Sequence, residues 1–377
     1  MRAFPGVAAA AAALILGACG GSGDSGTTTP LEKTCAQDPT QAKCITPPTT
    51  TLRGLASAKG RSFGVSVDAA FFGASPAAYD AVVAREFNLI VAGNVMKWSS
   101  IHRDSRYSYR WTNPDSMVAF AQANGMKVRG HTLVWYQQNP AWLTGATWDP
   151  DTLKVVLKEH IDSVVGHYKG KILAWDVVNE AFNDGTGSLR VTGSPWATTL
   201  GAGYIDLAFQ EARAADPAAL LFYNDYNLET PGLKQDSVFA RLSGMKSRGV
   251  PIDGIGFQAH FQVNADATGV PSKETLIATF NRFAALGLKI HITELDIRVR
   301  TPGATSAELT AQSQGFTNIT AACLAVAACE AMIVWGLNDG ESWVNSTFPG
   351  YGQALLFDDS YGKKATYNAV TASLQAP

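Results

Sequence analysis

Long basic runs are absent from this 377-residue sequence, in which 30 lysines and arginines nearly balance 32 aspartates and glutamates. The formal net charge of −2 argues against a nucleic-acid partner, because contacts to phosphates need clustered positive charge. Long apolar runs are scarce as well. The run at residues 7–16 spans about ten residues, half of the roughly twenty that a membrane-spanning helix needs.

The start of the chain nevertheless predicts export. Met1 and Arg2 precede the apolar run, which ends in Leu16-Gly17-Ala18-Cys19 and resembles the lipobox of bacterial lipoproteins. We expect residues 1–19 to be a signal peptide and Cys19 to carry a lipid, the only link to a membrane at the bacterial cell envelope, periplasmic or surface-facing. The alternative is a plain signal peptide and a secreted protein. Residues 20–51, rich in Gly, Ser, Thr and Pro, predict a flexible tether to a folded domain at 52–377.

Cysteines are few, and their positions favour disulfides over a metal site. With Cys19 assigned to a lipid, Cys35 and Cys44 form one pair close in sequence, and Cys323 and Cys329 form another. An exported protein meets an oxidising compartment, so we expect a disulfide in each pair. A four-cysteine metal site is disfavoured because the pairs lie far apart without metal-ligand spacing. No other ligand cluster stands out, and we expect neither metal nor cofactor.

A repeating pattern of short apolar runs and helical segments fills the chain from residue 52 onward. The runs are at residues 63–67, 89–94, 127–135, 173–180, 220–226, 254–260, 289–296 and 331–339. Eight such units predict a closed (β/α)8 TIM barrel, an α/β fold in a single catalytic domain. A doubly wound open sheet is the alternative, but its Gly-rich phosphate turn after the first strand is missing here.

Start and stop signals mark the helices between these runs. Asp149 before Pro150 predicts an N-cap, and the apolar positions at 153–165 fall on one helical face. Asn113-Pro114-Asp115 predicts another helix start, and Gly125 predicts where that helix ends.

Polar residues gather at the carboxyl ends of the predicted strands. They are Asn94, His131, Asn179, Glu180, Asn224, Asp225, Gln258, His260, Glu294, Asp296, Asn338 and Asp339. Because a TIM barrel places its active site at this end, the pattern predicts one shared pocket.

Two glutamates stand out among them, Glu180 at the end of the fourth run and Glu294 at the end of the seventh. These strands face each other across a barrel, so both carboxyl groups can flank one bound bond. Glycosidic cleavage needs such a pair, one group to protonate the leaving oxygen and the other to attack or to activate water.

Longer motifs surround both glutamates. They are Gly130-His131-Thr132-Leu133-Val134-Trp135, Trp175-Asp176-Val177-Val178-Asn179-Glu180, Ile292-Thr293-Glu294-Leu295-Asp296, and Trp335-Gly336 through Ser342-Trp343. Through these motifs the chain resembles glycoside hydrolase family 10, the retaining endo-β-1,4-xylanases, over residues 52–376. The resemblance implies hydrolysis of β-1,4-xylosidic bonds in xylan by double displacement. We expect a monomer whose partner is xylan or a xylo-oligosaccharide.

The resemblance also implies a role for each site residue. It makes Glu180 the acid and base and Glu294 the nucleophile, with His260 and Asp296 supporting Glu294. Asn179 and Gln258 are expected to donate to the sugar 2-hydroxyl and to the nucleophile. The remaining substrate contacts are Asn94, Lys97 and His131 on the glycone side, Tyr226 on the aglycone side, and Trp135, Trp335 and Trp343 as walls.

The chain departs from the family pattern at two places. Gly93 stands where the family carries a glutamate on the glycone side, and Tyr136-Gln137 follows Trp135 where a histidine is common. At Gly93 we expect either room for a substituted sugar, arabinosyl or uronosyl, or a gap filled by a neighbouring residue.

Two other functions stay open at this point. The chain could act on another β-linked glycan or small glycoside, because many barrels share this pair of carboxylates. It could also be a non-catalytic lipoprotein that captures glycans, although the full set of Glu180, Glu294, Asn179, Gln258 and His260 argues against this.

Overall fold

The computed structural model describes residues 49–68 and 77–377. The predictions for Cys19, Cys35 and Cys44 lie outside the described residues. Among those that are described, no helix is both long and apolar enough to cross a membrane.

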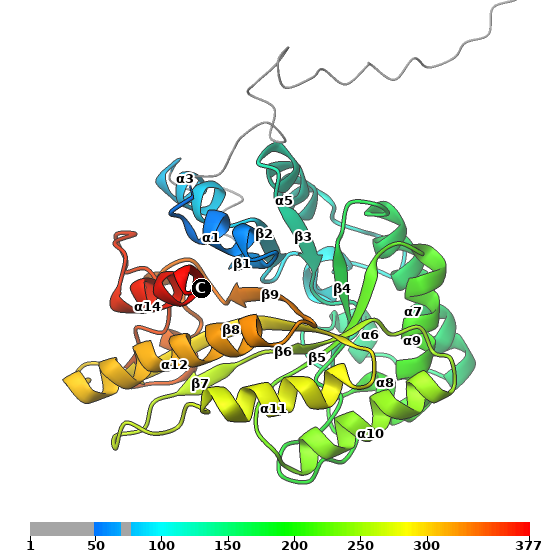
Figure 1. Ribbon diagram of the computed structural model, residues 1–377. Coiled ribbons are helices and arrows are strands. Elements are labelled where there is room, and N and C mark those ends of the chain that lie inside the picture. Colours follow the sequence, from blue (N-terminus) through cyan, green and yellow to red (C-terminus); the bar gives the residue numbers. More distant parts are fainter. Residues whose placement is uncertain (1–48, 69–76) are drawn as a thin grey trace, which may run out of the picture.

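Eight parallel strands form a closed barrel, which confirms the predicted TIM barrel (Figure 1). Each strand pairs with the next one along the chain, and the last pairs with the first through Val65 and Val334. The strands are β1 (Ser62–Val67), β2 (Leu89–Ala92), β3 (Lys127–Gly130), β4 (Ala174–Asn179), β5 (Leu220–Asp225), β6 (Gly254–Phe257), β8 (Lys289–Arg300) and β9 (Cys329–Val334).

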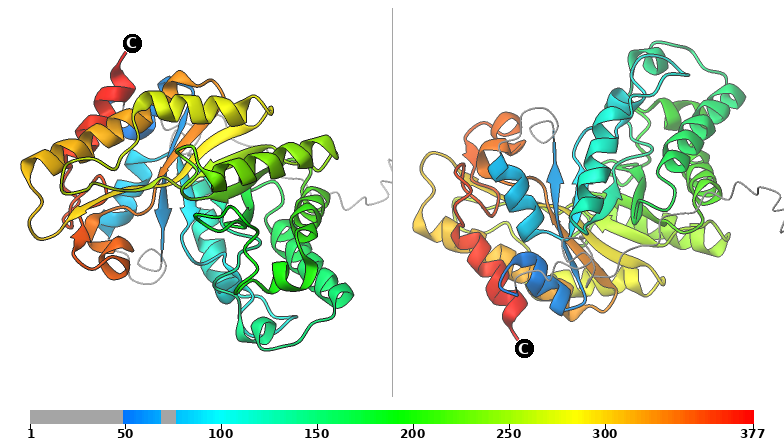
Figure 2. Two further views of the ribbon diagram at one scale, coloured as in Figure 1. Left: turned by 90° about the horizontal axis from the view of Figure 1, so that it is seen from below. Right: turned by 90° about the horizontal axis from the view of Figure 1, so that it is seen from above.

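Figure 2 shows the helices lying outside these strands. One long helix follows each strand: α3 (Ala77–Glu86), α5 (Thr112–Ala123), α7 (Pro150–His167), α9 (Gly203–Ala215), α10 (Leu233–Ser247), α11 (Lys273–Ala284), α12 (Ser306–Ala325) and α14 (Ala365–Gln375). An additional helix, α1 (Leu52–Ala58), packs against α14. Shorter helices occupy the loops: α4 (Trp98–Ile101), α6 (Ala141–Thr144), α8 (Pro195–Leu200), η2 (Asp339–Glu341) and α13 (Val344–Thr347).

The sixth predicted run is two strands rather than one. β6 ends at Phe257, and Ala259 has a φ of +60°, a left-handed conformation that cannot continue an extended strand. His260 then opens β7 (His260–Gln262), which pairs with the long outer part of β8. A final short strand, β10 (Tyr351–Gly352), adds antiparallel to the end of β8.

The helix signals are confirmed in two places and wrong in one. Asp149 caps α7 by accepting hydrogen bonds from the amides of Asp151 and Thr152, and Gly125 takes a φ of +59° just after α5. The helix start predicted at Asn113-Pro114-Asp115 is wrong by one residue: α5 begins at Thr112, and Trp111 takes the N-cap position without a side-chain hydrogen bond.

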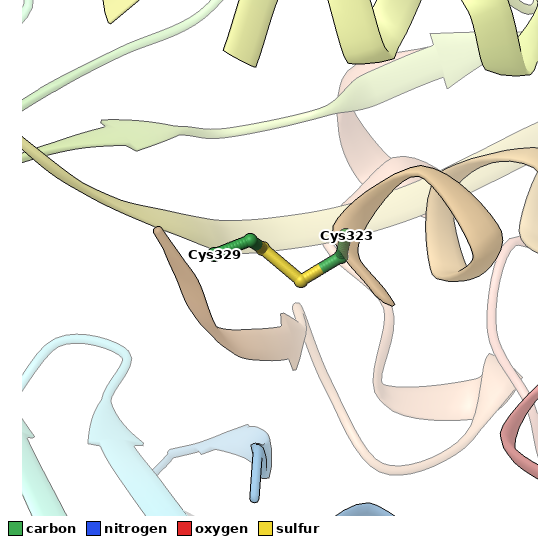
Figure 3. The surroundings of a disulfide bond; sticks show 2 residues. All are labelled: Cys323 and Cys329. Carbon is green, nitrogen blue, oxygen red and sulfur yellow. A yellow bond between two sulfur atoms is a disulfide. The ribbon is translucent and has the colours of Figure 1, made fainter. Parts of the chain in front are cut away.

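Close packing inside the wall of the barrel depends on a glycine. A Cβ at Gly130 would lie 2.2 Å from the buried ring of Trp175 on the next strand, so any side chain here would clash. The predicted disulfide between Cys323 and Cys329 is present and joins the end of α12 to the first residue of β9 (Figure 3). It therefore lies at the amino end of that strand, away from the polar ends.

Candidate active site

A cleft of about 710 Å³ opens at the carboxyl ends of the strands. Twelve of the thirteen predicted catalytic and substrate-binding residues line it: Asn94, Lys97, His131, Trp135, Asn179, Glu180, Tyr226, Gln258, His260, Glu294, Trp335 and Trp343. The thirteenth, Asp296, is fully buried directly behind His260.

Glu294, on β8, is held by a relay through His260. Nε2 of His260 lies 3.1 Å from Oε2 of Glu294, and its Nδ1 lies 2.9 Å from Oδ2 of Asp296. Burial alone would lower the pKa of His260, but the two carboxylates outweigh it and raise the pKa to about 10. Burial would likewise raise the pKa of Glu294, yet hydrogen bonding to His260 and nearby positive charge lower it overall. The site therefore keeps Glu294 ionised.

Buried amides connect the two glutamates across the floor of the cleft. Asn224 donates 2.8 Å hydrogen bonds from Nδ2 to Oε1 of Glu294 and to Oδ1 of Asn179. Asn179 and Gln258 both donate to Oε1 of Glu180, at 3.1 and 3.0 Å. The expected hydrogen bonds from Asn179 and Gln258 to the nucleophile are thus absent among the described residues, because their amide groups face Glu180. Asn224 supplies the donor instead.

Glu180 follows β4 directly and has a φ of +55°. The indole Nε1 of Trp135 donates to its Oε2 at 3.0 Å, which anchors the second carboxylate oxygen. Arg190 donates from Nε to the backbone carbonyl of Glu180 and from Nη2 to that of Phe182, both at 3.0 Å. Trp135 therefore holds the side chain of Glu180, and Arg190 holds the backbone turn that directs this carboxyl group into the cleft.

Tyr226 lines the cleft and is held by two cations. Its hydroxyl accepts from Arg190 at 3.0 Å, and Nζ of Lys234 lies 3.5 Å from its ring centroid. Lys234 in turn pairs with Asp225 at 2.8 Å and with Asp184 at 3.0 Å. These contacts restrain the orientation of the Tyr226 ring, as stacking on a sugar would require.

The two residues after Trp135 lie on the same side as Tyr226. The guanidinium of Arg190 lies 4.4 Å from the ring centroid of Tyr136, and Gln137 donates to the Tyr136 hydroxyl at 2.5 Å. At this departure from the family pattern, Tyr136 adds an aromatic ring to the cleft lining next to Arg190.

Lys97 and Asn94 form a polar contact next to Trp135. Nζ of Lys97 donates to Oδ1 of Asn94 at 3.1 Å and lies 4.9 Å from the ring centroid of Trp135. Burial lowers the pKa of Lys97, while the charges of Glu294 and Glu180 oppose that shift.

His131 is held by a residue of β4, Asp176, that does not line the cleft. Its Nδ1 lies 3.0 Å from Oδ2 of Asp176, which also pairs with Arg129. The ring packs edge-on against Trp335, with centroids 5.4 Å apart. Trp343 contacts the edge of His260 in the same way and donates from Nε1 to Asp296 at 2.7 Å. These tryptophans line the cleft and also support its histidines.

The four histidines outside the motifs contribute nothing to the cleft lining. His102 and His160 form a buried pair, His291 is buried at the amino half of β8, and His167 contacts Asp115 at the surface. Within residues 49–68 and 77–377, no group of three or more His, Cys, Asp or Glu side chains is arranged to hold a metal ion.

Sequence reasoning missed three residues that shape the site. Asn224 carried a usable signal, since it is one of the polar residues at the strand ends, but no motif assigned it a role. Arg190 and Lys234 lie in a loop and on α10 and gave no local signal.

Comparison with known proteins gives a consistent picture. The sequence profile described as Glycosyl hydrolase family 10 matches residues 51–373. Endo-1,4-beta-xylanase B of Thermotoga neapolitana is 42% identical over 292 residues, which cover 78% of this chain and 82% of the relative. Endo-1,4-beta-xylanase 5 of Pyricularia oryzae is 39% identical over 317 residues, covering 83% of this chain and 76% of the relative.

Solved structures agree with these relatives. Xylanase 10B from Thermotoga petrophila, determined with xylobiose, superposes with a TM-score of 0.82 at 40% identity, covering 86% of this chain and 97% of the other. Native xylanase 10B from Thermotoga maritima gives a TM-score of 0.82 at 41% identity, covering 86% and 98%. With a profile match over most of its length and relatives at about 40% identity, the chain belongs to glycosyl hydrolase family 10.

Proposed function

We propose that this protein is an endo-1,4-β-xylanase, which cleaves β-1,4-xylosidic bonds in xylan and xylo-oligosaccharides with net retention. The xylanases among its relatives and the cleft at the strand ends support this proposal. The observation that carries it is the relay from Asp296 through His260 to Glu294, set across buried amides from a second carboxyl group, Glu180. Double displacement requires two carboxyl groups that flank one glycosidic bond, and Glu180 and Glu294 line the same cleft.

In the first step, the carboxyl group of Glu180 gives its proton to the glycosidic oxygen as the bond to the anomeric carbon breaks. Glu294 attacks that carbon from the opposite face and forms a glycosyl ester. In the second step, the Glu180 carboxylate takes a proton from a water molecule, whose oxygen attacks the anomeric carbon and releases Glu294. His260 stabilises the Glu294 carboxylate before and after the covalent intermediate.

The direct test is release of reducing sugar from xylan, with the anomeric form of the first product followed by NMR. We expect activity in the wild type, initial release of the β-anomer, and near-complete loss in Glu294→Ala. Glu274→Ala, on the exposed first turn of α11, serves as the matched control and keeps wild-type activity. A folded wild type that releases no sugar from xylan contradicts the proposal, and release from another β-glycan alone would redirect it to that substrate.

For the residues outside the described structure, we propose export, lipid attachment at Cys19 and a tether at 20–51 ahead of a catalytic domain at 52–377. The lipobox-like Leu16-Gly17-Ala18-Cys19 supports attachment, and a disulfide between Cys323 and Cys329 suits an oxidising compartment. Metabolic labelling with a fatty acid should mark the wild type and not Cys19→Ala. Label in both, or in neither, contradicts lipidation at Cys19. Light scattering tests the proposed monomeric state.

A further inference from the structure

The glycone end of the cleft is the part lined by Asp68, Gly93, Asn94, Lys97 and Glu341. Gly93 has close neighbours on β1 at the position where a Cβ would lie. A Cβ at this position would lie 3.0 Å from Oγ of Ser66 and 3.2 Å from the carbonyl oxygen of Val67, both on β1. The end of β1 therefore packs closely beside the Cβ position of Gly93.

The residue directly after β1 brings a carboxylate to the same place. Asp68 is exposed to the cleft, and its Cβ lies 3.6 Å from the Cβ position of Gly93. Its Oδ2 accepts a 2.5 Å hydrogen bond from Nδ2 of Asn94. Oδ1 of Asn94 accepts in turn from Lys97 and from Gln138, each at 3.1 Å. Asp68 thus joins the polar group that contacts sugar on this side.

Glu341 places a second carboxylate nearby, at the end of η2. Burial raises the pKa of Glu341, and the negative charge of Asp68 adds to that effect. The same two carboxylates contribute to the raised pKa of the buried Tyr79 between β1 and this part of the cleft, after the larger effect of burial. Asp68 and Glu341 line the same cleft as Lys97, and we call these two carboxylates the acidic rim.

We propose that Asp68 is a specificity-determining residue, whose carboxylate accepts hydrogen bonds from hydroxyls of the sugar next to the cleaved xylose on the glycone side. It takes this role in place of a side chain at Gly93. The acidic rim of Asp68 and Glu341 suits neutral sugars, whose hydroxyls donate to carboxylates, and repels a uronic acid carried on that sugar. This inference rests on the proposed xylanase function.

Two aryl glycosides separate the contribution of this end from that of the catalytic pair. An aryl β-xyloside occupies only the cleaved position, whereas an aryl β-xylobioside adds the next glycone sugar. Asp68→Ala should lower kcat/KM on the xylobioside about 10- to 100-fold and on the xyloside less than about threefold, as expected for a charge-assisted hydrogen bond to one sugar. Asp68→Asn, which keeps the shape, should fall between. Asp151→Ala, at a highly exposed aspartate of α7, is the matched control.

The charge effect has its own test with xylobiosides that carry an arabinosyl or a glucuronosyl group on the glycone sugar. The wild type should favour the arabinosyl substrate at least tenfold, and Asp68→Asn/Glu341→Gln should bring that ratio toward one. The inference is overturned if Asp68→Ala lowers kcat/KM equally on the xyloside and the xylobioside, or lowers it on neither. It is also overturned if the double variant leaves the ratio of arabinosyl to glucuronosyl hydrolysis unchanged. A wild-type protein that hydrolyses neither these substrates nor xylan would contradict the proposed xylanase function. That outcome can be distinguished from a failure of the inference about Asp68 alone.

Discussion

Arg190 donates a hydrogen bond from Nε to the backbone carbonyl of Glu180, a residue held at a φ of +55°. A left-handed conformation costs a non-glycine residue about 1–3 kcal/mol, so it persists only where the surroundings enforce it. Arg190 also binds the carbonyl of Phe182 and the hydroxyl of Tyr226. One side chain thus links the turn that carries Glu180 to the aromatic ring of Tyr226.

We therefore predict that Arg190→Ala lowers kcat on xylan about 10- to 100-fold, because the acid loses its alignment with the glycosidic oxygen. KM should also rise, since Tyr226 loses a partner. Steady-state kinetics measure both effects. Arg110→Ala, which removes an exposed arginine paired with Asp104, is the control and should leave both parameters unchanged. Wild-type kcat in a folded Arg190→Ala variant would refute the positioning role.

The relay at Glu294 predicts a change in pH dependence. His260, with a pKa of about 10, is charged near neutral pH and holds the pKa of Glu294 below its ordinary value. In His260→Gln that charge is gone while burial still acts, so the pKa of Glu294 rises. The acidic limb of kcat/KM against pH should move upward by about one unit or more, with lower activity throughout. His167→Gln, at the surface, is the control. An acidic limb that stays in place argues against the relay.

The buried pair of His102 and His160 predicts acid sensitivity of the fold. Burial and the proximity of His102 lower the pKa of His160 well below 6.5, and its ring stacks 3.6 Å from that of Trp98. The folded state keeps His160 neutral while the unfolded state binds a proton below pH 6.5. Stability is therefore fully present above that pH and is lost as the pH falls, by up to about 1.4 kcal/mol per unit for each such group.

Urea unfolding at pH 7.5 and pH 5 measures this loss. His160→Gln should be less stable at pH 7.5, because the stacking on Trp98 is lost, yet its stability should fall less between the two pH values. The same decrease in wild type and variant would show that His160 does not contribute to the acid sensitivity.

The disulfide between Cys323 and Cys329 is expected to affect stability and not catalysis. It closes a short loop with a sequence separation of 6, for which the chain-entropy estimate is roughly 2 kcal/mol. Cys323→Ala, Cys329→Ala and the double variant should lose similar stability in denaturant unfolding, since each breaks the same bond. kcat on xylan should stay unchanged, because the bond lies at the amino end of β9. Additive losses, or a fall in kcat, contradict this assignment.

Much of the architecture could be predicted because barrel periodicity is local. Each strand run, such as 63–67 or 289–296, carries its own apolar pattern, and polar residues at the strand ends predict one shared cleft. The break at Ala259 could not be predicted, because an alanine rarely adopts a positive φ. That conformation depends on contacts from other elements, including a hydrogen bond from its amide to the buried carboxylate of Glu229.

By itself, the sequence determined the barrel, the placing of Glu180 and Glu294 at strand ends in one cleft, and the disulfide between Cys323 and Cys329, because pattern, motif and spacing are properties of neighbouring residues. Only the tertiary structure decided which amide serves which carboxylate, and that Asp68, directly after β1, lies beside Gly93, directly after β2. Both outcomes depend on the register between strands that are far apart in the chain. Hydrogen bonds between side chains act over about 3 Å. Side chains that come this close only after folding can be far apart in the sequence, so the sequence pattern cannot show which of them will pair.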